Sequence, residues 1–464
     1  MTGKEKTLNR RDLVLFSVSA ILLLDTLAAG AVTGPSVVFW WVFLGLVFFI
    51  PFGLMNAELG CTFPEQGGIY AWVRDAYGER WSARVTWSYW INIAVWLPAI
   101  YILFAGMFSQ LFSLSLSLTA QIAIGIGLCW LTVAVNVMAL EVGKWVPNLG
   151  AFIKMVAFSV IIIGGLSLGF SAGSANAFTL ESVLPSFGDS FVYLPALIYG
   201  MLGFELVSAS SEEMQDPARD VPYGIFVSGA IILTGYTLAT VAILIALPAD
   251  DIDLVEGLMD ALFVLLGDSS FGRGFAVVLG VGVLYTFFSN GVTWALGGNR
   301  AMAEAAQAGE MPALLGRESA RGTPLGAALA LGVACTAVLL VYGYLAGSNE
   351  DLFWALFAFS AVLFIFPYAV LCPAFLTLRA KYPEVLRPFR VPGGNGIVRF
   401  LANWCMGVLV VTLVLFCWTP DGGIQWPVVI GSAVLFLLGE VVIRLNERRV
   451  GAAAPQATRS PGAR

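Results

Sequence analysis

The feature of this sequence that most limits its fold is the recurrence of apolar stretches of about 20 residues with almost no charge. Such a stretch is as long as an α-helix that crosses the hydrocarbon core of a bilayer, which is about 30 Å thick. Of the 464 residues, 59% are apolar and only 12% are charged. These proportions exclude a soluble multidomain protein and predict an all-α membrane protein.

Twelve transmembrane helices account for nearly the whole chain. We predict them at residues 11–33, 36–60, 82–111, 116–139, 147–169, 191–211, 222–247, 273–305, 324–346, 351–378, 400–418 and 426–445. The first helix is not expected to be a cleaved signal peptide, because it lacks a small-residue cleavage site and a second full-length span follows at once. The chain therefore has no room for a large soluble domain.

The distribution of the basic residues predicts the orientation. If the amino terminus is cytoplasmic, 22 of the 24 Lys and Arg residues lie on the cytoplasmic side, and the exceptions are Arg273 and Lys154. This asymmetry predicts that both termini are cytoplasmic and that the protein is a multi-pass protein of the plasma (inner) membrane. The predicted outer loop 250–268 carries six acids and no base, and is either a solvated loop or a vestibule that concentrates cations.

The chain contains no histidine, which excludes His-ligated metals and Ser–His or Cys–His catalytic pairs. The six cysteines are scattered singly without CxxC spacing and are expected to be apolar packing residues. We therefore expect no catalytic residue, no metal, no cofactor and no nucleic-acid partner. The expected partners are a small-molecule substrate, protons and the lipid bilayer.

Three ionisable residues lie within predicted spans, where an unpaired charge is costly and therefore indicates function. They are Asp25 in the first span, Lys154 in the fifth and Glu205 in the sixth. The first and sixth spans also contain glycines, and they lie five spans apart. That spacing is typical of a five-plus-five inverted repeat, in which the first helix of each repeat is broken near the bilayer midplane to hold a substrate.

The predicted division of the chain follows from this repeat. We expect a cytoplasmic amino terminus (1–10), a first five-helix repeat (11–170), a second repeat (191–378), helices 11 and 12 (400–445) and a disordered cytoplasmic tail (446–464). Helices 1 and 6 are expected to be broken, with glycine at each break because the backbone must leave helical geometry there. The alternative is that these glycines only allow close helix packing.

Several segments resemble a known family over most of the chain. They are Ala57–Gly60 with Phe63–Tyr70, Gly203–Glu205 with the residues that follow, Asn299–Pro312 and Arg387–Gly394. These segments resemble those of the amino acid/polyamine/organocation permeases, which are similar in fold to LeuT-type transporters. Phe48–Pro51 and Gly67–Val73 further resemble the glutamate/GABA antiporter branch.

The resemblance implies roles for particular residues. Glu205 would be the proton-coupling acid of the sixth helix, and Tyr199 an aromatic gate over the substrate. Trp294 would face the substrate side chain from the eighth helix, and Tyr89 resembles a gating tyrosine of the third. Aromatic faces suit these positions because they attract ammonium groups and exclude water without adding charge.

Lys154 resembles the ammonium that sodium-independent members place where sodium-coupled relatives hold a sodium ion. It would tether the first and eighth helices and take part in proton coupling; the alternative is that its side chain reaches the cytoplasmic surface. The residue pattern and the resemblance together predict the following site. The substrate-binding residues would be Asp25, Thr26, Ala29, Gly30, Tyr89, Tyr199, Gly200, Gly203 and Trp294, and the proton-coupling residues Glu205 and Lys154.

The first span departs from the family pattern. The usual Gly-Ser-Gly-Ile-Phe signature is absent, and residues 25–30 read Asp-Thr-Leu-Ala-Ala-Gly. Asp25 places a negative charge where a substrate carboxylate would be expected to meet backbone N–H groups. Either its side chain turns away, or it is protonated, or the cationic end of the substrate lies there. The substrate is therefore either a zwitterionic amino acid or an amine.

The function predicted from these features is secondary active transport of amino acids or related amines by alternating access, linked to protons or operating as exchange. One alternative is a transporter of polyamines or other organic cations. An alternative of another class is a polytopic membrane enzyme, which would need a nucleophile and a base clustered at one bilayer surface.

Overall fold

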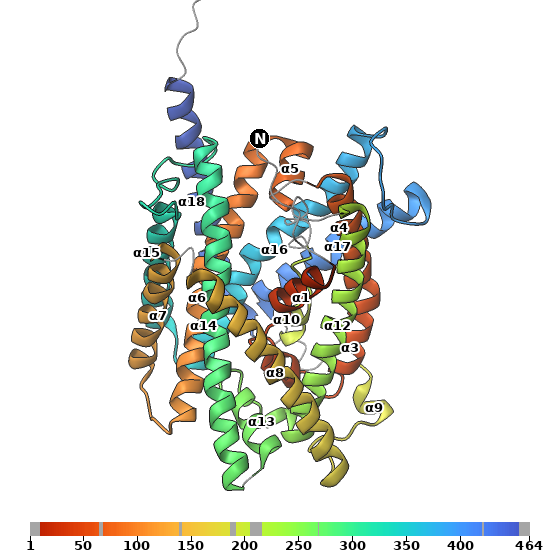
Figure 1. The fold of residues 1–464 in the computed structure, drawn as a ribbon, viewed down its shortest axis with the longest axis vertical. Coiled ribbons are helices and arrows are strands. Elements are labelled where there is room, and N and C mark those ends of the chain that lie inside the picture. The colour runs from red at the N-terminus through yellow and green to blue at the C-terminus, as the bar shows by residue number, and fades with distance from the viewer. Residues whose placement is uncertain are drawn as a thin grey trace, which may run out of the picture.

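The computed structural model describes residues 10–64, 68–138, 142–185, 192–204, 216–267, 269–419 and 422–453. Within these ranges the chain is almost entirely helical, and most long helices run along the long axis of the molecule (Figure 1). Ten helices of the described part are long and apolar enough to cross a bilayer. The all-helical membrane fold predicted from the sequence is thereby confirmed at this level.

Nine of these ten candidate spans are single α-helices. They are α6 (Glu79–Leu111), α7 (Leu118–Met138), α8 (Val142–Ser171), α12 (Pro217–Ala246), α14 (Ser270–Gln307), α15 (Leu325–Leu345), α16 (Asn349–Lys381), α17 (Gly394–Cys417) and α18 (Trp426–Ala453). The tenth is composite, with α3 (Val37–Leu44), the π-helical turn η1 (Gly45–Phe49) and α4 (Ile50–Thr62) in one continuous run.

Short elements cover the two ends of the molecule. Figure 1 shows α5 (Ile69–Tyr77) at one end of the long axis and α13 (Gly257–Leu266) at the other. We call these ends the α5 face and the α13 face. The remaining short elements are α9 (Leu180–Val183), the 3-10 turn η4 (Ala249–Asp251) and the two-stranded antiparallel pair β1 (Trp418–Thr419) and β2 (Gly423–Ile424).

Two of the predicted spans are interrupted. The first consists of α1 (Arg10–Ile21) and α2 (Leu27–Val32), with non-helical backbone between them. The sixth begins with α10 (Leu194–Tyr199) and leaves helical geometry from Gly200 to Phe204, beyond which residues 205–215 lie outside the described part. None of the described pieces is long enough to cross a bilayer alone, so neither span is among the ten.

The interruption of the first span does not lie at the glycine that the sequence suggested. Gly30 is inside α2, where its N–H donates to the carbonyl of Thr26 at 3.0 Å. The nearest atom to a Cβ at Gly30 would be the methyl of Thr240 at 3.5 Å, an ordinary contact. The break therefore precedes Gly30 and spans residues 22–26, which include Asp25.

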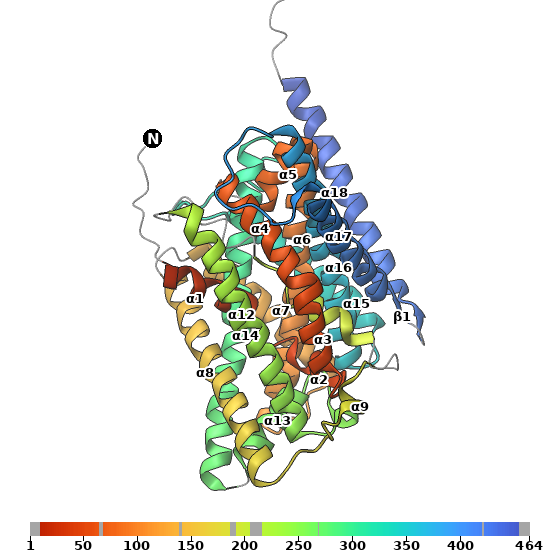
Figure 2. The same cartoon turned by 90° about the vertical axis from the view of Figure 1, so that its right-hand side faces the viewer.

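The interior of the bundle is built around α6 and α16. In the apolar window of α6, 89% of the residues are buried, and in that of α16 78% are. The same share is only 22% in α18 and 28% in α17, which run side by side along one edge of the molecule in Figure 2. Helices that face lipid keep apolar side chains exposed, so the burial pattern separates central from peripheral helices.

An ionic cluster ties helices together near the α5 face. Glu58 on α4 is buried, and Arg379 on α16 donates to both of its oxygens, through Nε at 2.7 Å and Nη2 at 2.6 Å. Nε of Arg387 lies 3.2 Å from the same carboxylate, and the backbone N–H of Val391 donates to it at 2.8 Å. We call these four residues the Glu58 cluster. It joins α4 to α16 and to the loop before α17.

Candidate functional site

The break in the first span is held by a side chain from another helix. The hydroxyl of Tyr236 on α12 accepts from the backbone N–H of Leu23 at 2.8 Å and donates to the carbonyl of Ile21 at 2.7 Å. The ring of Trp41 stacks on Tyr236 with centroids 4.8 Å apart. In lipid every backbone polar group needs a partner, so Tyr236 makes non-helical backbone tolerable at this depth.

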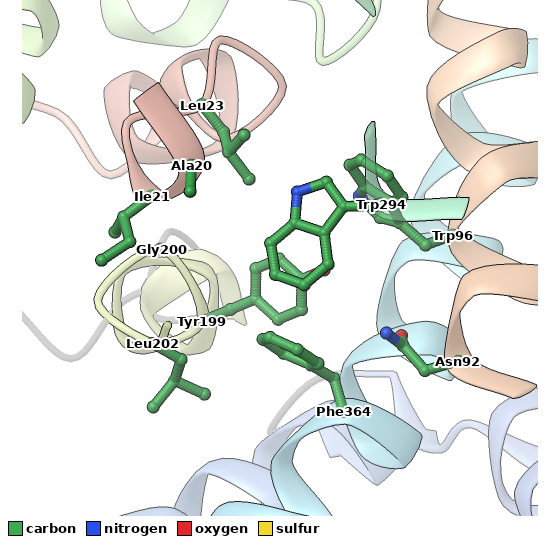
Figure 3. Close-up of a pocket in the computed structure, with 10 residues that line it drawn as sticks. All are labelled: Ala20, Ile21, Leu23, Asn92, Trp96, Tyr199, Gly200, Leu202, Trp294 and Phe364. Carbon is green, nitrogen blue, oxygen red and sulfur yellow. The ribbon is translucent and has the colours of Figure 1, made fainter. Parts of the chain in front are cut away.

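A cavity lies between the two interrupted spans and the central helices (Figure 3). It is lined by Ala20, Ile21, Leu23, Asn92, Trp96, Tyr199, Gly200, Leu202, Trp294 and Phe364. We call it the central cavity. Its volume is about 10 Å3, close to the minimum of roughly 10–15 Å3 that one water molecule needs. The side chains thus close tightly around it, and a larger ligand requires them to move apart.

Aromatic rings form much of the cavity wall. The ring of Trp294 on α14 lies 6.1 Å from that of Trp96 and 5.8 Å from that of Phe364, between centroids. Tyr199, at the end of α10, lies 5.2 Å from Phe364. Tyr89 is not a lining residue, but its ring lies 6.2 Å from Trp294. Faces of this kind attract cations and exclude water.

Asp25 lies in the break and does not itself line the cavity, but its neighbour Leu23 and its hydrogen-bond partner Trp96 do. Its side chain is 3% exposed, and its Oδ2 accepts from Nε1 of Trp96 at 3.1 Å. The carboxylate also lies against the backbone N–H of Thr26. Its Oδ1 accepts no hydrogen bond from any described residue. A buried oxygen of a charged group without a partner is costly, which marks it as a candidate contact for a ligand.

Lys154 on α8 lies inside the bundle. Its side chain is 1% exposed, and Nζ donates to Oδ1 of Asn290 on α14 at 2.9 Å. The ammonium is close enough to Asp25 for their opposite charges to attract. The alternative in which Lys154 reaches the surface is therefore wrong. Asn290 lies on the eighth predicted span, so this hydrogen bond connects the fifth and eighth predicted spans through a side-chain amide.

The other predicted site residues fall into three groups. Gly200 lines the cavity, and Gly203 lies in the interruption of the sixth span with φ of 124°, a conformation that favours glycine. Thr26, Ala29 and Gly30 are buried in or beside α2 and do not line the cavity. Glu205 lies outside the described residues.

Sequence reasoning missed several residues of this site. Asn92 and Trp96 share one face of α6 with Tyr89, because positions three and four apart on a helix are neighbours. Asn92 is a polar residue within an apolar run, so the rule that selected Asp25 could also have found it. Phe364 and Tyr236 carry no comparable signal, since aromatic residues are common throughout this chain.

The described residues offer no obvious metal ligand set. Within the described ranges, no three Asp, Glu or Cys side chains come together as a metal site would require. The cavity wall instead offers one amide and several aromatic faces, and one carboxylate and one ammonium are buried behind it in the bundle. This combination suits non-covalent recognition of a small cationic molecule.

Comparisons with known proteins agree with this arrangement. The sequence profile of the family described as amino acid permease matches residues 8–439. A probable agmatine/putrescine antiporter of Lactococcus lactis is 31% identical over 452 residues, which cover 95% of each chain. A glutamate/gamma-aminobutyrate antiporter of the same species is 21% identical over 465 residues, covering 95% of this chain and 92% of that one. An uncharacterized transporter of Legionella pneumophila is 30% identical, covering 89% and 90%.

Proposed function

This chain belongs to the amino acid permease family and is a secondary transporter of amino acids or amines, and from that premise we propose that its substrate is a cationic amine without a carboxylate, exchanged across the membrane. The observation that carries the proposal is the buried carboxylate of Asp25, whose Oδ1 has no hydrogen-bond partner among the described residues and whose Oδ2 accepts from Trp96, a residue of the aromatic cavity wall. An ammonium group supplies both the charge and the N–H donors that this oxygen lacks.

An α-amino acid fits the same position poorly. Its carboxylate would approach a break whose Leu23 N–H is already bonded to Tyr236 and whose Thr26 N–H faces Asp25. Two carboxylates in one buried site repel each other unless one takes up a proton. Asp25 thus occupies the place of a substrate carboxylate, and a decarboxylated amino acid is the complementary ligand. The antiporter of agmatine and putrescine among the relatives supports this substrate class.

Lys154 provides a reason for exchange. Without a bound amine, its ammonium balances the charge of Asp25 inside the bundle. When a cationic amine binds Asp25, two positive charges share one counter-charge, and loss of a proton from Lys154 restores the balance. Amine entry coupled to proton release, or replacement of one amine by another, both keep the buried site close to neutral. Glu205 remains our candidate for a second coupling acid.

The mechanism is alternating access around the central cavity. The interruptions of the first and sixth predicted spans border this cavity, and they support a LeuT-like five-plus-five repeat with twelve spans in all. The α5 face carries the basic residues Arg74, Arg80, Arg84, Arg379 and Lys381, which supports a cytoplasmic assignment for that face. We place the protein in the plasma membrane with both termini cytoplasmic.

Exchange in proteoliposomes tests this function. Vesicles containing the purified protein and loaded with unlabelled 1,4-diaminobutane are expected to take up the labelled compound in a saturable manner, with strong trans-stimulation. Asp25→Asn removes the counter-charge and is expected to lower exchange at limiting substrate at least about a hundredfold. Asp25→Glu keeps the charge and serves as the matched control. Exchange by the Asp25→Asn protein at the wild-type rate would remove Asp25 from amine recognition.

A further inference from the structure

Asn92 is a second polar group with an unused acceptor at the same cavity. Its side chain is 3% exposed, and its Oδ1 accepts no hydrogen bond from any described residue. Figure 3 shows the amide reaching from α6 toward the space bounded by Trp294 and Phe364. A buried amide oxygen is normally paired, so an unpaired one on a side chain that lines a cavity is a candidate acceptor for a ligand donor.

Asn92 lies on the same face of α6 as Trp96, the hydrogen-bond partner of Asp25. The two residues are four apart on α6, which places them about 6 Å apart along the helix axis. The indole of Trp96 donates to Asp25. It therefore connects Asp25 with the face of α6 that carries Asn92. The rings of Trp96, Trp294 and Phe364 lie around the central cavity.

We propose that Asn92 binds the second cationic group of a short diamine or guanidino-amine whose first ammonium binds Asp25. This inference rests on the proposed function and deepens it, because it specifies a substrate with two cationic ends joined by a few methylenes. The aromatic rings cover the stem and contact the cationic ends through their faces.

A neutral amide is suited to this second position. A carboxylate there would put two like charges into one buried cavity whenever no substrate is bound, and that arrangement is costly. The oxygen of Asn92 accepts from an ammonium or a guanidinium without adding charge. A monoamine leaves this oxygen unpaired, and a diamine does not, so Asn92 discriminates between ligands that Asp25 alone would bind alike.

The experiment compares 1,4-diaminobutane with 1-aminobutane, which share a stem and differ by one ammonium. Competition against labelled exchange gives the apparent affinity of each. The wild-type protein is expected to prefer the diamine, and Asn92→Leu, which removes the acceptor at similar volume, is expected to weaken the diamine about tenfold or more. The monoamine is expected to change less than about twofold in the same variant.

Asn136 provides a matched control. It lies on α7, is also 3% exposed, has an unpartnered amide nitrogen and does not line the central cavity. Asn136→Leu is expected to leave the preference for the diamine unchanged. Size-exclusion profiles of both variants show whether each protein is folded.

The outcomes separate this inference from the proposed function. Equal weakening of both amines by Asn92→Leu, or no weakening of either, would overturn the role of Asn92 and leave amine transport intact. If Asn92→Leu fails to fold, a wild-type protein that binds both amines equally well overturns the inference by itself. A wild-type protein that binds neither amine contradicts the proposed function as well.

Discussion

Two buried carboxylates of the described residues, Glu58 and Asp25, differ in how completely they are paired. Glu58 accepts from two arginines and one backbone N–H, and each of its oxygens has a short contact. Asp25 accepts from the indole of Trp96, and its Oδ1 has no partner among the described residues. A fully paired carboxylate stabilises a fold, whereas a partly paired one has the capacity to bind a ligand.

The surroundings of the two carboxylates also differ. The arginines of the Glu58 cluster come from α16 and the following loop, so the cluster fixes how α4 meets them near the α5 face. Asp25 lies in backbone that has left helical geometry, where Tyr236 supplies bonds that the helix would otherwise make. The Glu58 cluster holds the helices together near the α5 face, whereas the break at Asp25 leaves the centre of the bundle free to change conformation around a substrate.

Carboxylate-to-amide substitutions at the two sites give the largest expected difference. Glu58→Gln leaves two arginines without their buried counter-charge, and we expect it to lower the free energy of unfolding by about 3–5 kcal/mol. Asp25→Asn keeps an acceptor for Trp96 but removes the counter-charge of Lys154. Lysine, unlike arginine, can give up its proton when its counter-charge is lost, so we expect a smaller loss of about 1–2 kcal/mol. Thermal midpoints of the detergent-purified variants measure both effects. Equal midpoint losses in the two variants would contradict the distinction between the sites.

The same comparison shows what the sequence could predict. The long charge-free stretches correctly predicted membrane-spanning helices. In lipid the backbone N–H and C=O groups must bond to one another, and an α-helix satisfies them within one segment. Glycine content suggested a break at Gly30, but the interruption lies at residues 22–26, which include three leucines. The bonds that support it come from Tyr236, more than 200 residues away. The helix propensities of residues 22–26 do not depend on so distant a partner, so they could not predict the break.

The sequence also predicted only some of the residues of the candidate site. Asp25 and Lys154 were found because charge inside a span is rare, and the structure buries both. The resemblance to the family led to Tyr199 and Trp294, which line the central cavity. Phe364 could not be found, because apolar aromatic residues on many helices look alike in sequence and only packing separates them.

A third carboxylate sharpens the comparison outside the membrane-spanning helices. Glu310 follows α14 and accepts from the hydroxyl of Tyr70 at 2.7 Å, and its second oxygen has no hydrogen-bond partner within the described ranges. Burial is the main reason that the pKa of Glu310 is raised above its ordinary value of 4.5. The folded protein therefore holds this proton more tightly than the unfolded chain, and stability falls as pH rises from 4.5 through the folded-state pKa.

Glu310→Gln is expected to remove this pH-dependent loss and to keep the acceptor for Tyr70. The effect is the smallest of those predicted, because the side chain is only partly buried. Thermal midpoints measured from pH 4.5 toward neutrality should fall less steeply in the variant than in the wild type. Glu318→Gln, at an exposed position nearby, is the control. Identical slopes for wild type and Glu310→Gln would show that burial of Glu310 does not affect folding.

The central claim is that Asp25 takes the place of a substrate carboxylate, and a matched pair of ligands tests it most directly. Ornithine is 1,4-diaminobutane with one added α-carboxylate. A ligand that binds only the folded protein raises its thermal midpoint, so both compounds are compared on the purified wild-type protein. We expect 1,4-diaminobutane to raise the midpoint in a concentration-dependent manner and ornithine to have little effect. Stabilisation by ornithine equal to or greater than that by the diamine would contradict the claim.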